Sequence, residues 1–356
     1  MTCISFSWSV IIKVQNRFDI SEKAGENVSV TIKDIARVCG VSYSTVSRVL
    51  NGKTVRQSDR NQHIIATARA LGYKPHYIAK QLVEQRSDSI GLLIPDIANP
   101  HYPEITRNVQ HFAEAAGYQV LIFNTDWDVT KECRLRDSLL EKRVAGMIVM
   151  PVCDESHLIF RGLEVPVAFL GTRTEEKDID YVVMDNVRAA ADATEHLIRS
   201  GVNSLAYIGR KIMNYTSFDR AQGFRFAAQK YGIPDERAVI AMANSFQEKG
   251  GYTAMRELLD APFLPEGVLV FNDQLALGAM EAMEERGLTV GKDILLVSFD
   301  DLQFSSLSKI SLTTITPSKE ELGRLAVGCI LRRIQNPDAD RCARVLPSTM
   351  IHRKSG

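Results

Sequence analysis

The sequence of 356 residues lacks the features that mark several large classes of protein. It has no apolar run long enough to cross a membrane, so we expect no membrane partner. Its six cysteines are scattered, with no CxxC pair and no histidine at the spacing of zinc ligands, so we expect neither a disulfide framework nor a metal site. A nucleophile elbow, a phosphate-binding loop and a clustered acid–base set are also missing, which argues against an enzyme, catalytic residues or a cofactor.

The first 29 residues lack the basic start and the small-residue cleavage site of a signal peptide, and they show no helical or strand period. We interpret 1–29 as a disordered extension without an assigned role, or as the result of a start codon placed upstream of the native one. Because no export signal is recognised, we expect a cytoplasmic protein.

Net charge is zero, because 43 lysines and arginines offset 43 acids, but the charge is unevenly distributed. Residues 30–87 hold ten lysines and arginines against three acids, a net charge of +7, and the first 29 residues balance. The remaining residues therefore carry a net charge of −7. A basic segment joined to an acidic body predicts a polyanionic partner for the basic segment alone.

Residues 31–51, TIKDIARVCGVSYSTVSRVLN, have the pattern of two short helices joined by a tight turn. Thr31 is placed to cap the first helix, and apolar residues at positions 32, 35, 36 and 39 form one helical face. Gly40 tolerates the left-handed backbone that ends a helix, and Ser42 can cap the second helix over 43–50. This helix-turn-helix pattern is typical of proteins that bind DNA.

The second helix has an apolar face, which is expected to point inward, and a polar face. The apolar residues are Val46, Val49 and Leu50. Polar side chains on the outward face suit contacts with base edges and phosphates. These side chains are Tyr43, Ser44, Ser47 and Arg48. A helical hairpin with a solvated polar face is the alternative interpretation.

A third amphipathic segment near 58–71 ends at GYKP, because the residue before a proline disfavours the α region. Together, the segments TIKDIARVCGVSYSTVSRVLNG, VRQSDR, ALGYKP and IAKQL closely resemble the DNA-binding head of the lactose-repressor (LacI/GalR) family. One departure is Arg56, which stands where the family has a serine that caps the third helix. The cap is therefore expected to shift to Ser58 or to be lost.

The resemblance implies a small all-α helix-turn-helix DNA-binding domain over 30–77 and a hinge helix over 78–87. The hinge would be disordered away from DNA and would fold on a palindromic operator of double-stranded DNA, where Leu82 and its dimer mate enter the minor groove. An ordinary linker over 78–87 is the alternative. The residues that the resemblance implies as DNA contacts are Thr31, Tyr43, Ser44, Thr45, Ser47, Arg48, Asn51, Tyr73, Ala79 and Leu82.

From residue 88 onward, short apolar runs alternate with amphipathic segments, which is the pattern of a parallel βαβ architecture. The resemblance implies an α/β periplasmic-binding-protein-like type I core over 88–356, whose two lobes exchange chain segments near 184–186 and near 315–345. The predicted strands are 89–94, 119–123, 146–150, 167–170, 181–184, 204–208, 238–241, 268–271 and 294–299. The predicted helices are 103–117, 130–143, 155–163, 219–231, 250–259 and 275–286.

Ligands of open α/β sheets bind beyond the carboxyl ends of the strands, so a pocket is expected among these loops. The effector-binding residues that the resemblance implies are Tyr102, Arg220, Phe246, Asn272 and Asp300. Structural alternatives are a lid for Tyr102, a solvated helix position for Arg220 and the core for Phe246. Asn272 could also be a helix N-cap, although we assign the cap to Asp273 and a turn position to Asp301.

The sequence therefore predicts a homodimeric transcriptional repressor, located on the bacterial nucleoid, whose operator affinity is controlled by a small polyol, sugar or sugar derivative. A solute-binding protein of a sugar transport system is the alternative, but it would need an export signal and no basic head. Gly171 stands where some sugar-binding relatives have an acid, which argues against a galactoside effector. The segment IMNYTSFDR lacks the extra arginine of a purine-binding relative.

Overall fold

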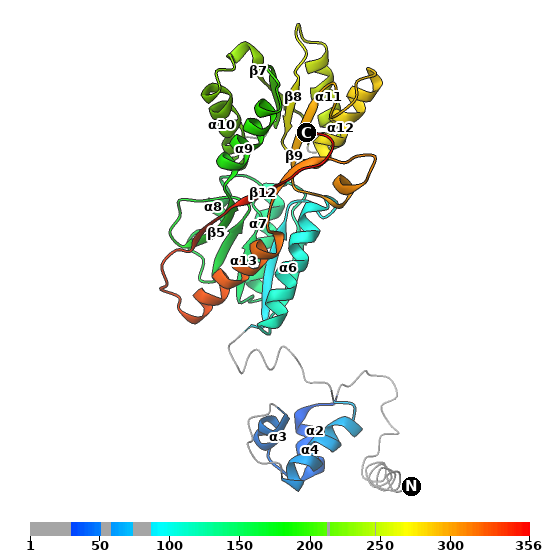
Figure 1. Cartoon of the computed structure of the whole chain (residues 1–356). Coiled ribbons are helices and arrows are strands. Elements are labelled where there is room, and N and C mark those ends of the chain that lie inside the picture. Colours follow the sequence, from blue (N-terminus) through cyan, green and yellow to red (C-terminus); the bar gives the residue numbers. More distant parts are fainter. Residues whose placement is uncertain (1–29, 51–57, 74–86, 212–213, 246) are drawn as a thin grey trace, which may run out of the picture. The chain divides into compact units, whose positions relative to one another are not determined.

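The structure, a computed structural model, describes residues 30–50, 58–73, 87–211, 214–245 and 247–356. The chain divides into two compact units, Met1–Arg86 and Ser87–Gly356, which we call the head and the core (Figure 1). Several predictions lie outside the described residues, and they concern the extension 1–29, residues 78–86 of the hinge, and the site residues Asn51, Ala79, Leu82 and Phe246.

The described part of the head contains three helices, α2 (Ile32–Cys39), α3 (Tyr43–Leu50) and α4 (Asp59–Ala70). Gly40 ends α2 with a φ of +63°, the left-handed conformation predicted for the turn. The Ser58 hydroxyl accepts a hydrogen bond from the Asn61 N–H at 3.3 Å, so the cap of α4 has shifted to Ser58. The three helices pack around a small apolar core of Ile35, Ala36, Val46, Val49, Ile64 and Ala68.

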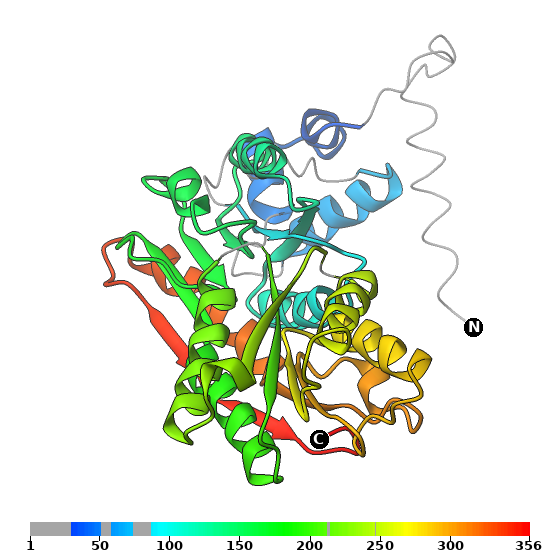
Figure 2. The same cartoon turned by 90° about the horizontal axis from the view of Figure 1, so that it is seen from above.

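The core unit has two lobes, each built on a six-stranded sheet (Figures 1 and 2). The strand order is β11-β5-β4-β3-β1-β2 in the first lobe and β12-β10-β9-β8-β6-β7 in the second. Every strand pair is parallel except β10 with β12. The parallel βαβ architecture predicted from the sequence is therefore confirmed.

The first lobe contains strands β1 (Ser89–Ile94), β2 (Gln119–Asn124), β3 (Gly146–Val149), β4 (Val167–Leu170), β5 (Ile179–Met184) and β11 (Ala343–Leu346). Its helices are α6 (His101–Ala115), α7 (Val129–Glu141), α8 (Ser156–Phe160) and α13 (Lys319–Gln335). Side chains of α6 and α13 join one apolar cluster, whereas those of α7 and α8 join another. The sheet is therefore covered on both faces, which explains why its central strands are apolar throughout.

The second lobe contains strands β6 (Leu205–Arg210), β7 (Ala238–Ala243), β8 (Gly267–Val270), β9 (Leu295–Phe299), β10 (Thr313–Pro317) and β12 (Ser348–Ile351). Its helices are α9 (Asn186–Arg199), α10 (Tyr215–Lys230), α11 (Glu248–Leu259) and α12 (Asp273–Glu285). One continuous apolar cluster connects this sheet with its helices. Within the described residues, neither lobe has a helix long and apolar enough to cross a membrane.

The chain passes between the lobes three times, after β5, after β10 and between β11 and β12 (Figure 1). No predicted element corresponds to α9, β10, α13, β11 or β12, although exchanges between the lobes were predicted near 184–186 and 315–345. The two last strands have only four residues each, and β11 is largely exposed. Such short strands show no usable apolar period, because their partners rather than their own residues determine the pairing.

Glycines allow α11 and α12 to approach each other closely. A Cβ atom on Gly278 of α12 would lie 1.8 Å from the backbone oxygen of Glu248 in α11, and one on Gly251 would lie 1.8 Å from the backbone oxygen of Leu275. Backbone atoms cannot yield as a flexible side chain can. Both positions therefore require glycine.

We expect Gly278→Ala to lower the free energy of unfolding by about 3 kcal/mol, at the upper end of the cost of overpacking a core, because the two helices must separate. Gly328→Ala in α13 is the matched control, since no atom lies within 4 Å of its added Cβ. That control should raise the free energy of unfolding by about 0.5–1 kcal/mol through helix propensity. Urea denaturation of the two variants measures both effects, and equal values would contradict the close-approach interpretation.

Candidate functional site

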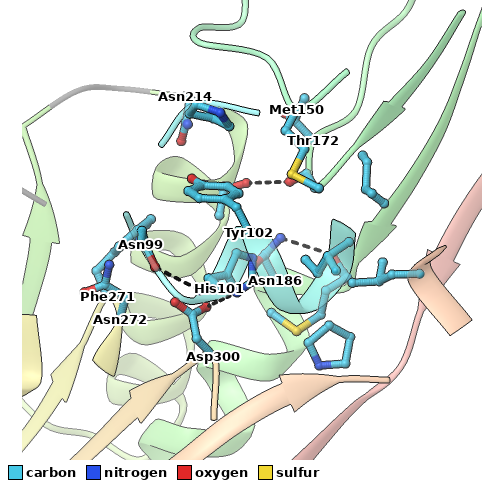
Figure 3. A pocket seen from close by; sticks show the side chains of 18 of the residues that line it. Asn99, His101, Tyr102, Met150, Thr172, Asn186, Asn214, Phe271, Asn272 and Asp300 are labelled. Carbon is cyan, nitrogen blue, oxygen red and sulfur yellow. Dashed lines mark hydrogen bonds and ion pairs between the residues drawn. The ribbon is translucent and has the colours of Figure 1, made fainter. Parts of the chain in front are cut away.

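A pocket lies between the two lobes of the core, beyond the carboxyl ends of strands from both sheets (Figure 3). Its volume is about 130 Å³, roughly ten times the space that one water molecule requires. The pocket therefore has room for a small organic molecule. Four of the residues predicted from the sequence line it, namely Tyr102, Arg220, Asn272 and Asp300.

Arg220 lies in α10 and is buried, with 7% of its surface exposed, so the alternative of a solvated helix residue is wrong. Its Nε donates a hydrogen bond to Oδ1 of Asn186 at 2.9 Å, and its Nη1 donates to the backbone oxygen of Phe271. The guanidinium also lies over the ring of Phe299, 3.9 Å from the centroid. These contacts hold the side chain in one orientation at the wall of the pocket.

Asp300 follows β9 in a strained backbone conformation, with a φ of +106°. Its Oδ1 lies 3.5 Å from Nδ1 of His101, which belongs to the other lobe. Burial lowers the pKa of His101, and the negative charge of Asp300 opposes that change. Asp301 also has a positive φ, of +47°, and its carboxylate pairs with Arg353 at 2.7 Å. The turn thus directs Asp300 into the pocket and Asp301 away from it.

Asn272 rather than Asp273 is the N-cap of α12, which corrects the sequence-based assignment. The Asn272 Oδ1 accepts a hydrogen bond from the Leu275 N–H at 2.8 Å. Asp273 is fully buried, and its carboxylate accepts hydrogen bonds from the hydroxyls of Ser298, Ser305 and Thr314 and from the Leu302 N–H. These donors come from distant segments, so a local capping pattern could not reveal them.

Tyr102, the second residue of α6, lines the pocket. Its ring meets the ring of Trp127 edge to face, with centroids 6.2 Å apart, and it meets His101 at 5.3 Å. Burial raises the pKa of the Tyr102 hydroxyl, which therefore stays protonated at neutral pH. The aromatic walls offer apolar faces, on which the carbon-bound hydrogens of a sugar ring can pack.

Sequence reasoning missed several polar lining residues, and each of them follows the carboxyl end of a strand or stands at it. Figure 3 shows the side chains of Asn99, His101, Thr172 and Asn214 at the pocket. The buried hydroxyl of Thr172 finds no hydrogen-bond acceptor or donor among the described residues. The remaining residues of this group are Asn186, Arg210 and Thr216. Position after a strand was the available signal, although residue type did not distinguish these residues from ordinary loop residues.

Three residues predicted for DNA contacts are exposed on α3. They are Tyr43, with 64% of its surface exposed, Ser44 and Arg48. Thr45 and Ser47 on the same helix are half-buried. Tyr43, Ser44 and Arg48 thus form an exposed polar face of α3, as a helix that enters the major groove requires.

The two remaining predicted contacts in the described head have structural partners as well. The Thr31 backbone N–H donates to the Asp34 carboxylate at 3.0 Å, and the Thr31 hydroxyl donates to the same carboxylate at 2.6 Å. Tyr73 packs against the apolar core of the head, and burial raises the pKa of its hydroxyl. Both residues remain predictions as DNA contacts.

Comparison with known proteins gives consistent results for both units. Residues 31–76 match the bacterial regulatory proteins of the lacI family, and residues 194–356 match a periplasmic binding protein-like domain. The chain is 31% identical over 331 residues to the HTH-type transcriptional regulator RegA of Clostridium saccharobutylicum, covering 92% of this chain and 99% of RegA. It is 32% identical over 333 residues to the ribose operon repressor of Escherichia coli (strain K12), covering 91% of this chain and 99% of that repressor. The crystal structure of the Lac repressor dimer bound to operator and the anti-inducer ONPF is similar to this structure, with a TM-score of 0.82 and 27% sequence identity. The match covers 92% of this chain and 99% of the Lac repressor chain.

Proposed function

The chain belongs to the lacI family of bacterial regulatory proteins, and we propose that it is a cytoplasmic homodimeric repressor of transcription without enzyme activity. Its operator affinity is controlled by a small sugar-like effector. The observation that carries this proposal is the combination of an exposed polar helix in a basic head with a polar, aromatic pocket between two lobes. A solute-binding protein of a transport system would not need the basic head.

The pocket side chains support a polyol as the effector. Asn99 and Asn214 use their side-chain oxygens to accept hydrogen bonds from nearby backbone N–H groups, at 3.0 and 2.9 Å. Their amide NH2 groups are thus oriented away from these backbone contacts and can donate to ligand oxygens. Together with the Thr172 hydroxyl, they provide the dispersed donors and acceptors that a sugar needs.

Contacts between the lobes indicate how an effector controls the head. The Thr216 hydroxyl donates to the backbone oxygen of Gly171 at 3.1 Å, and Arg173 pairs with Asp219 at 2.9 Å. A ligand held between the lobes stabilises the lobe arrangement in which it makes most contacts. Because binding energies are linked, an effector that prefers the lobe arrangement unsuited to operator binding weakens that binding, and one that prefers the other arrangement strengthens it.

A selection of binding sites from random double-stranded DNA with the full-length protein tests this function. We expect enrichment of a sequence with two half-sites related by a dyad, as a homodimer requires. Sugars, sugar acids and sugar phosphates are then added one at a time to the complex, and the change in DNA affinity is measured. Failure to enrich any sequence, or enrichment of a single half-site bound as tightly by monomers, would exclude the proposed function.

Two substitutions in the head should separate sequence recognition from general attraction to DNA. We expect Arg48→Ala to lower the binding free energy for the selected site by about 1–3 kcal/mol and to relax the preference at one base position, because Arg48 is exposed on α3. Lys33→Ala on α2 removes another exposed charge, and it should weaken binding to all DNA sequences by a similar amount. Fluorescence anisotropy on matched and mutated sites measures both, and an unchanged base preference for Arg48→Ala would contradict the assignment.

A further inference from the structure

Trp127 lies in the turn between β2 and α7, where two consecutive residues adopt a backbone conformation that side chains rarely take. Asp126 has a φ of +55° and Trp127 a φ of +58°, in the left-handed region that favours glycine. Such a conformation is costly, persists only where the surrounding contacts hold it, and is concentrated at functional sites. The strain therefore indicates a function for the Trp127 side chain.

Hydrogen bonds on both sides of Trp127 hold this turn. The Asp126 carboxylate accepts from Nδ2 of Asn124 at the end of β2 and from Nζ of Lys131 in α7. Asp128 is the N-cap of α7, and its carboxylate accepts from the Lys131 N–H at 3.2 Å. The turn is thus fixed to the strand before it and to the helix after it, which gives Trp127 a defined position.

The Trp127 ring lines the pocket and contacts a cation of the other lobe. The guanidinium carbon of Arg210 lies 4.8 Å from the centroid of this ring. Arg210 is the last residue of β6 in the second lobe, and 5% of its surface is exposed. Its guanidinium carbon also lies 5.1 Å from the ring centroid of Phe271, a residue of the same lobe. Arg210 therefore contacts one aromatic ring from each lobe, and we call its contact with Trp127 the interlobe stack.

The interlobe stack differs from other contacts between the lobes in its burial and its place. The ion pair of Arg173 with Asp219 is partly exposed, with 40% of the Arg173 side chain accessible, and exposed ion pairs contribute little. A cation on an aromatic face contributes more when it is removed from water, and tryptophan is the best aromatic partner. Trp127 and Arg210 both line the pocket, so an effector bound there lies beside the interlobe stack.

On the basis of the effector control described above, we propose that the interlobe stack stabilises the lobe arrangement of this structure and thereby determines part of the operator affinity. Trp127 acts as a positioning residue, because its strained turn places the ring where Arg210 of the other lobe reaches it. The stack contributes to the equilibrium between lobe arrangements in the absence of effector. An effector shifts the same equilibrium, so its binding and the stack are linked.

A double-mutant cycle on the full-length protein tests the interlobe stack through DNA binding, although both residues lie in the core. The affinity for the selected DNA site is measured without effector, by fluorescence anisotropy, for the parent, Trp127→Leu, Arg210→Met and the double variant. We expect both single variants to change this affinity in the same direction, by roughly 2- to 30-fold, and the double variant to change it no further. Unchanged affinity in both single variants, shifts in opposite directions or additive shifts would overturn the proposal.

Matched controls separate the interlobe stack from the loss of a ring or a charge elsewhere in the core. Phe218→Leu and Lys211→Met remove an exposed ring and an exposed charge that do not line the pocket, and both should keep the operator affinity of the parent. Trp127→Phe and Arg210→Lys retain a ring and a cation, so each should show a smaller change than the variant that removes the group.

Thermal unfolding of the same four proteins separates a failed interlobe stack from a failed regulatory function. We expect the decreases in unfolding temperature of the two single variants not to add in the double variant. A parent protein that selects no DNA would remove the proposed function, and additive decreases in unfolding temperature would then overturn the interlobe stack as well. A parent that binds its selected site, together with single variants that bind it equally well, would overturn the interlobe stack alone.

Discussion

Replacement of Arg220 by methionine is expected to weaken effector binding by roughly 100-fold and to abolish the effect of the ligand on operator affinity. The guanidinium is held by Asn186 and by the backbone oxygen of Phe271, so it stands in one orientation at the pocket wall. Methionine keeps much of the volume but provides no donor and no charge. Calorimetry on the full-length protein measures the affinity, with the ligand that changes DNA binding most in the screen described above.

Arg225→Met in the same helix is the control, because Arg225 is exposed and does not line the pocket. We expect the control to keep both the effector affinity and the response of DNA binding. The unfolding temperatures of both variants are compared first, so that a loss of folding is recognised. A folded Arg220→Met protein with the effector affinity of the parent would show that Arg220 does not bind the effector.

Asp273→Ala is expected to lower the free energy of unfolding by about 3 kcal/mol or more, although Asp273 does not line the pocket. Its carboxylate is the common acceptor for three hydroxyls and one backbone N–H, which join α12, β9, β10 and the loop after β9. Removal of the acceptor leaves these buried donors without their partner, and each such loss costs about 1–3 kcal/mol. Urea denaturation followed by circular dichroism measures the change.

The pH dependence of this effect follows from the pKa of Asp273, which burial raises to about 6 from an ordinary value of 3.8. A raised pKa in the folded state means that the group stabilises the fold fully below about pH 4, and that this stabilisation declines as the pH rises through 6. The decrease in the free energy of unfolding caused by Asp273→Ala should therefore be larger at pH 5 than at pH 7.5. Asp260→Ala removes an exposed ion pair with Arg286 and should cost less than about 1 kcal/mol. Equal decreases in the free energy of unfolding for both variants would show that the hydrogen bonds of Asp273 do not stabilise the fold.

Local patterns allowed much of the secondary structure to be predicted. Strands β1 and β4 and helices α2 and α3 have the predicted bounds, because each carries its own period and its own ending residues. For the cap of α4 the sequence left two alternatives, a shift to Ser58 or loss of the cap, and the structure has the cap at Ser58. Helices α9 and α13 were not predicted, although α9 buries Ala189, Ala190, Ala193 and Leu197, which recur at helical spacing.

The site was predicted in part. Tyr102, Arg220, Asn272 and Asp300 came from the family resemblance, and all four line the pocket. Arg210 was not predicted, because its burial at the end of β6 depends on the folded chain and not on the residues beside it in the sequence. The choice between Asn272 and Asp273 as the helix cap also failed, since both residue types suit a cap equally well in sequence.

By itself, the sequence determined the basic head, the helix-turn-helix, the parallel βαβ core and the family, because these depend on charge counts, periods and motifs within short windows. Only the tertiary structure decided which side chains meet. His101 meets Asp300, Trp127 meets Arg210, and Asp273 collects donors from three segments because folding brings together the ends of strands that are remote in the chain. Burial, and with it the free energy of a charge, depends on those remote neighbours, so no local pattern can contain it.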